Sequence, residues 1–154
     1  MPTNLGAAIY GLVTIGALLA AESAQRETYA ETVGAVLITL VIYWFAHSYA
    51  EFASYRLEEH KRIELDDLGR TMRRQLPILV GASLPLFTLL FEWAVGASLE
   101  GAVTAAVWTA VATIVVIEII AGLRARQSGR ALFVQIAIGA LLGGLIVGLK
   151  LILH

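Results

Sequence analysis

The chain has 154 residues, of which 58% are apolar and 15% charged, whereas an ordinary soluble domain has about 45 to 50% apolar and about 25% charged residues. With 11 basic and 12 acidic residues its net charge is -1, so it has no basic surplus for nucleic-acid binding, and zero cysteines exclude disulfides, Cys-ligated metal centres and thiol catalysis. A mean hydropathy of +0.79 is typical of an integral membrane protein.

Five apolar segments approach the length of about 20 residues that a helix needs to cross about 30 Å of hydrocarbon. In chain order they cover approximately residues 5–21, 32–55, 76–96, 101–123 and 131–153. Lipid cannot satisfy free backbone groups, and the segments lack the alternation of barrel strands. The sequence therefore predicts one all-α membrane domain over residues 1–154, a polytopic bundle of five transmembrane helices in contact with the lipid bilayer.

A charged segment, 56–75, separates the second and third spans. Glu58 with Arg62 and Asp66 with Arg70 are each four residues apart, a spacing that favours a helix. We expect this helix to extend the second span into the cytoplasm and to turn at Gly69, or alternatively to lie on the membrane surface. It is also a candidate docking site for a protein partner.

The positions of lysine and arginine predict the orientation, because basic loops resist translocation. Nine of the eleven basic residues lie on one side of the predicted spans: Arg56, Lys61, Arg62, Arg70, Arg73, Arg74, Arg124, Arg126 and Arg130. The prediction is a multi-pass protein of the inner or plasma membrane, with a cytoplasmic N-terminus and an external C-terminus.

Three ionisable side chains lie at similar depth within the predicted spans, where each costs several kcal/mol unless it has a partner. His47 and Glu51 are four residues apart on one helix face, and Glu118 lies about 8 Å from the inner end of the fourth span. Together they predict a proton or divalent-cation site near the cytoplasmic side. The alternative is that His47 and Glu51 only stabilise helix packing near the headgroups.

Two further features lie within the third and fifth spans. Glu92 and Lys150 fall at similar depths near the outer side, which predicts a structural ion pair. Pro85 removes an amide donor and frees the Gly81 carbonyl, which predicts a kink that could act as a hinge.

Small residues in the fifth span predict close helix packing. Gly139 with Gly143, and Gly144 with Gly148, form two rows at four-residue spacing, and Ala7 with Gly11 forms a weaker row in the first span. Such rows let helix backbones approach closely in lipid. They predict a homo-oligomer, most simply a dimer, and leave open whether the rows pack within or between subunits.

The sequence contains none of the GxSxG, HExxH, P-loop or dinucleotide motifs, and no Glu-x-x-His pairs of a di-iron bundle. This favours a protein that is not an enzyme and has no cofactor, and it identifies no particular metal.

The string Trp44-Phe45-Ala46-His47-Ser48-Tyr49-Ala50 resembles one found in small uncharacterised bacterial integral membrane proteins. The resemblance covers a single span and implies no activity. The intramembrane His and Glu set leads to the hypothesis of a small oligomeric channel or transporter for protons or cations, with Pro85 permitting gating. The alternative is a non-catalytic subunit or assembly factor of a larger membrane complex.

Overall fold

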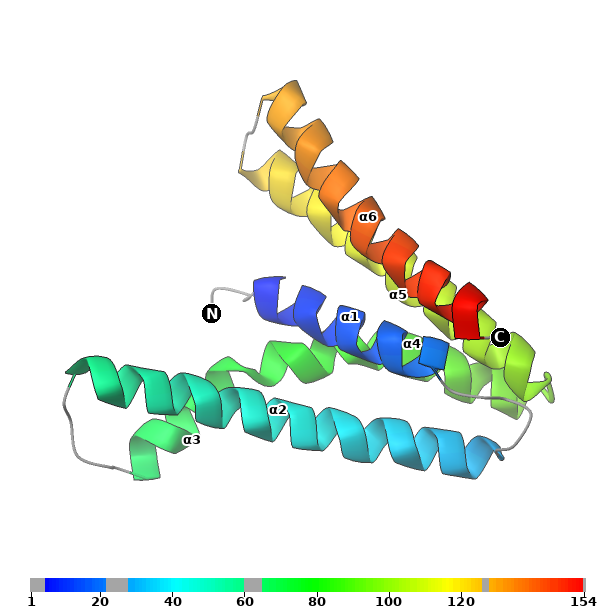
Figure 1. The fold of residues 1–154 in the computed structure, drawn as a ribbon, viewed down its shortest axis with the longest axis horizontal. Helices are drawn as coiled ribbons and strands as arrows, with labels where there is room; N and C mark the ends of the chain where they lie inside the picture. Colours follow the sequence, from blue (N-terminus) through cyan, green and yellow to red (C-terminus); the bar gives the residue numbers. More distant parts are fainter. Residues whose placement is uncertain (1–4, 22–27, 60–64, 126–127, 154) are drawn as a thin grey trace.

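A computed structural model describes residues 5–21, 28–59, 65–125 and 128–153. These residues form helices and no strand, as Figure 1 shows: α1 (Leu5–Ala21), α2 (Tyr29–Glu59), α3 (Leu65–Arg74), α4 (Leu76–Ala94), α5 (Leu99–Arg124) and α6 (Gly129–Leu153). By length and apolar composition four stretches can span a membrane, and α1 is a shorter apolar helix of 17 residues. The predicted all-α membrane bundle is confirmed.

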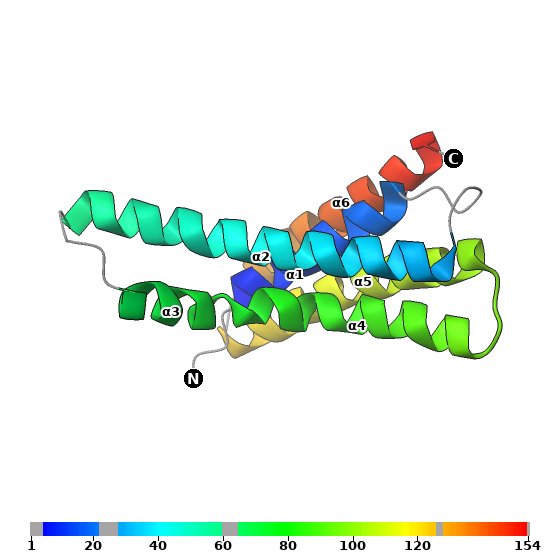
Figure 2. The same ribbon diagram turned by 90° about the horizontal axis from the view of Figure 1, so that it is seen from below.

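Helix α1 lies at the centre of the bundle, in contact with α2, α4, α5 and α6. Figures 1 and 2 show α2, α3 and α4 grouped on one side of α1, while α5 and α6 form a hairpin that slants away from α2. The fully buried side chains come mainly from α1, α4 and α5: Leu12, Ile15, Leu19, Ile78, Leu89, Val103, Val107 and Ile114. The core therefore forms where α4 and α5 enclose α1.

The backbones of α1 and α4 touch at two glycines. A Cβ atom added to Gly11 would lie 2.0 Å from the carbonyl oxygen of Ile78, and one added to Gly81 would lie 2.1 Å from the carbonyl oxygen of Ala8. No side chain fits into either space. Each helix thus contributes one glycine to a reciprocal contact, which is how small residues bring helices together in lipid.

Helix α2 begins three residues before the predicted start, because Thr28 and Glu31 cap it. The Thr28 amide donates to the Glu31 carboxylate at 2.8 Å, and the Glu31 amide donates to the Thr28 hydroxyl at 3.3 Å. This reciprocal pair is a capping box. Tyr29 then stacks on Trp93 with ring centroids 5.6 Å apart and donates its hydroxyl to the Ala97 carbonyl at 2.8 Å. The start of α2 is thereby held against the turn between α4 and α5.

The charged segment differs in part from its prediction. Helix α2 does run on through Glu59, as expected, but Gly69 lies inside α3 and is not a turn. Asp67, and not Asp66, pairs with Arg70, at 3.2 Å between Oδ1 and Nη1. Residues three apart are neighbours on one helix face, as residues four apart are. Residues 60–64, and with them the predicted partner of Glu58, lie outside the described residues.

Candidate functional site

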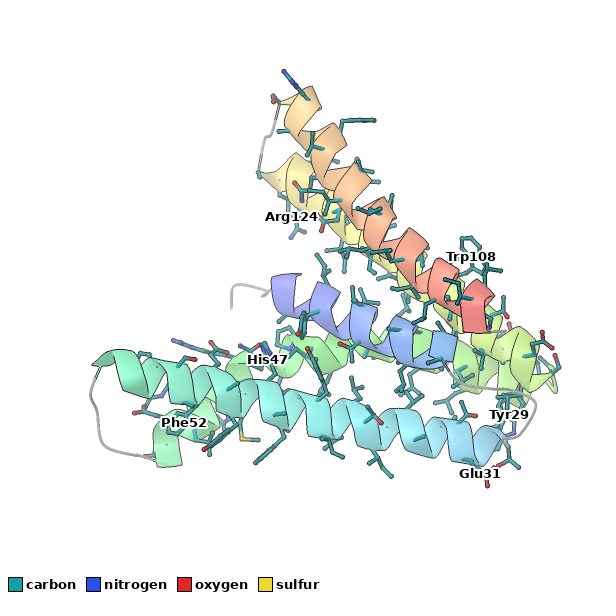
Figure 3. The ribbon with its side chains drawn as sticks, viewed as in Figure 1. Tyr29, Glu31, His47, Phe52, Trp108 and Arg124 are labelled. Atoms are coloured by element: carbon teal, nitrogen blue, oxygen red, sulfur yellow. The ribbon has the colours of Figure 1, made fainter. Side chains whose placement is uncertain are left out.

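The residues of the predicted ion site have separate surroundings. His47 lies between α2 and α1 (Figure 3), with its ring centroid 5.3 Å from that of Tyr10 and 6.2 Å from that of Tyr43. One turn further along α2, Glu51 accepts a hydrogen bond from the side-chain amide of Gln75, the residue between α3 and α4. His47 is therefore part of an aromatic cluster, while Glu51 is held by a neutral amide.

Glu118 belongs to a third environment, the interface of α5 and α6. The side-chain nitrogen of Gln135 donates to the Glu118 carboxylate at 2.5 Å and approaches the Glu118 backbone carbonyl at 3.4 Å. One amide thus holds both the carboxylate and the backbone of the opposite helix. This contact links the two helices of the hairpin within the apolar region.

The structure therefore does not bring His47, Glu51 and Glu118 together, which corrects the expected common site. The part of the chain that the structure describes contains no group of three or more His, Cys, Asp or Glu side chains able to hold a metal ion. Gln75 and Gln135 were missed because a neutral amide carries no charge signal, although it can satisfy a carboxylate.

The predicted ion pair between Glu92 and Lys150 is also not found. Among the described residues these two form no ion pair within 4 Å, and the carboxylate with an electrostatic effect on Lys150 is that of Glu100 at the start of α5. Glu92 instead acts electrostatically on Tyr29 of α2. Equal depth was the only basis for the prediction, and α6 packs against α5 and α1.

The two glycine rows of α6 face different surroundings. A Cβ atom at Gly139 would lie 2.9 Å from Cγ of Glu118, and one at Gly143 would lie 2.5 Å from Cγ1 of Val111. Added Cβ atoms at Gly144 and Gly148 would meet nothing within 4 Å. The first row therefore packs against α5 inside the protomer, and the second row faces outward.

Two serine hydroxyls within the spans, those of Ser48 and Ser83, bond to carbonyls of their own helices. Ser48 is fully buried and donates to the Trp44 carbonyl at 2.7 Å, while Ser83 is exposed and donates to the Val80 carbonyl at 2.7 Å. A serine nucleophile needs a base within about 2.6–3.2 Å. In the described residues His47, the one histidine there, makes neither of these contacts. Helix α4 runs without interruption through the buried Pro85.

The model of the Rhomboid domain matches residues 2–153. The chain therefore belongs to the Rhomboid family. Comparisons with curated proteins and with solved structures give no match.

This membership overturns the predicted function, because the Rhomboid domain indicates an intramembrane protease-like family, including inactive homologues, and not an ion channel or transporter. The prediction was wrong because it took charged side chains in lipid as evidence for transport. Two of those side chains are held by amides, which is a structural use of a carboxylate. Nothing in the family match points to the alternative subunit or assembly factor that docks a partner through 56–75.

Proposed function

We propose that this protein is a non-proteolytic member of the Rhomboid family that binds transmembrane helices side by side in the bilayer. The proposal rests on the contacts of the serine and histidine side chains, the types that a serine protease uses as nucleophile and base. The hydroxyls of Ser48 and Ser83 already donate to carbonyls of their own helices, and the imidazole of His47 stacks on tyrosine rings. These arrangements fix helix geometry and do not activate a nucleophile.

A serine-directed fluorophosphonate probe tests this proposal. In liposomes, the wild-type protein and the Ser48→Ala and Ser83→Ala variants are expected to show the same background labelling, because an unactivated hydroxyl reacts poorly. An active intramembrane serine protease in the same vesicles is the positive control. Labelling of the wild type that disappears in one serine variant would show an activated nucleophile and contradict the proposal.

The surface proposed for helix binding is the outward row of α6. Ala137, Ala140 and Gly144 are exposed, and Gly148 lies one turn beyond Gly144 on the same side. A second helix can approach closely along such a row. The simplest partner is α6 of a second copy, which would make the protein a homodimer.

Disulfide cross-linking tests this dimer directly, because the chain has no cysteine of its own. Gly144→Cys is expected to cross-link two copies in the membrane, since closely crossing helices bring paired Cα atoms within about 4.4–6.8 Å. Leu145→Cys is the matched control, because it has the same depth and an exposed side chain but lies about 100° around the helix. Equal cross-linking at both positions, or none at Gly144→Cys, would exclude this face as the dimer contact.

The proposed orientation places the Arg-rich end of the bundle in the cytoplasm. Figure 1 shows α3 and the connected ends of α5 and α6 at the same end of the bundle, opposite the C-terminus. This arrangement places the described arginines of α3 and of the connected ends of α5 and α6 on one side, which supports the proposed orientation.

Cysteine labelling in intact cells tests the orientation. A membrane-impermeant maleimide is expected to label His154→Cys and to leave Asp66→Cys unlabelled until the cells are opened. The reverse pattern would invert the topology.

A further inference from the structure

A small pocket of about 120 Å³ lies between α2 and α3. We call it the α2–α3 pocket, and its lining residues are Glu51, Tyr55, Asp67, Arg70, Thr71 and Arg74. The apolar stretch of α2 ends at Tyr55, and α4 begins at Leu76 on the neighbouring chain segment. The pocket therefore lies where the apolar part of the bundle meets its charged end, which is the depth of lipid headgroups.

Among the described residues, the positive and negative groups that line the pocket are equal in number. Glu51 and Asp67 supply two carboxylates, and Arg70 and Arg74, one turn apart on α3, supply two guanidinium groups. Asp67 contacts Arg70 at 3.2 Å, and both residues line the pocket. A simple anion would be attracted by the arginines but repelled by the carboxylates. A zwitterion can satisfy both kinds of group at once.

Gln75 holds the Glu51 carboxylate from outside the pocket lining. The Gln75 side chain is only 5% exposed and its nitrogen donates to Glu51. A carboxylate only accepts hydrogen bonds, so the amide must present its nitrogen to Glu51. The buried Gln75 Oε1 atom is then left without a hydrogen-bond partner among the described residues. Because this oxygen is buried and Gln75 does not line the pocket, Gln75 positions the Glu51 carboxylate and is not a ligand contact.

We propose that the α2–α3 pocket binds the headgroup of an ethanolamine phospholipid. Its phosphate lies against Arg70 and Arg74, whose planar donors suit phosphate oxygens. Its ammonium donates to the Glu51 carboxylate. A choline headgroup has no N–H group, and a glycerol headgroup has no positive charge, so each satisfies only part of the site. This proposal goes beyond helix binding and does not depend on it.

Native mass spectrometry of the full chain in detergent tests the proposal, with ethanolamine, choline and glycerol phospholipids of identical acyl chains. The ethanolamine lipid is expected to bind about tenfold more tightly than the other two, since it alone fills both halves of the site. Arg74→Gln and Glu51→Gln are expected to remove this preference. Both residues are exposed, and the amide oxygen of Glu51→Gln can still accept from Gln75, so both variants are expected to fold.

Arg73→Gln is the matched control, because Arg73 is an exposed neighbour on α3 that does not line the pocket. It should keep the preference. Competition by soluble phosphoethanolamine would show that the headgroup alone is recognised, and a lack of competition with retained selectivity would show that the lipid is the ligand. Equal binding of the three lipids, stronger binding of the glycerol lipid, or equal losses in Arg73→Gln and Arg74→Gln would each overturn the proposal.

Discussion

Gly11→Ala is expected to destabilise the bundle by about 3 kcal/mol or more, an overpacking effect at the upper end of the usual range. The added Cβ would lie 2.0 Å from the Ile78 carbonyl oxygen, and a backbone atom cannot move aside as a side chain can. Helices α1 and α4 must separate, which opens the core around Leu12 and Ile78. Gly81→Ala should have a similar effect, because its Cβ would lie 2.1 Å from the Ala8 carbonyl oxygen.

Chemical unfolding in detergent micelles measures this effect, and Gly34→Ala provides the matched control. Gly34 lies inside α2, and a Cβ atom there meets nothing within 4 Å. Alanine is a better helix former than glycine by about 1 kcal/mol, so this variant should be unchanged or slightly more stable. If Gly11→Ala and Gly34→Ala unfolded at the same midpoint, the close α1–α4 contact would be contradicted.

The fold class could be predicted from the sequence, because hydropathy and segment length report directly on lipid as the solvent. The contacts between helices could not be predicted from the sequence. A glycine row is visible on one helix, as at Gly144 and Gly148, but the α1–α4 contact takes one glycine from each of two helices. The weaker row of the first span does include Gly11. Nothing in the sequence says that its partner is Ile78.

The same limit applies to the candidate site. Depth along a span can be estimated from the sequence, and it marks Glu51 and Glu118 as groups that need partners. Helix packing decides which helices are neighbours. It places Glu51 in hydrogen-bond contact with Gln75, and Glu118 with Gln135. The predicted meeting of these carboxylates assumed that equal depth means contact. The family membership likewise could not be recognised from short motifs.

Gln135→Leu is expected to destabilise the α5–α6 hairpin by about 1.5–3 kcal/mol, the range for losing a hydrogen bond to a charged group. Leucine fills a similar volume but leaves the Glu118 carboxylate in an apolar interface without its donor. The double variant Glu118→Leu, Gln135→Leu should recover much of the loss, because removing both partners leaves no unpaired polar group. Unfolding midpoints of the two single variants and the double variant form the cycle that measures this coupling. Additive losses would show that Gln135 stabilises the hairpin by packing alone. The hydrogen bond between Gln135 and Glu118 would then contribute nothing to the stability of the α5–α6 hairpin.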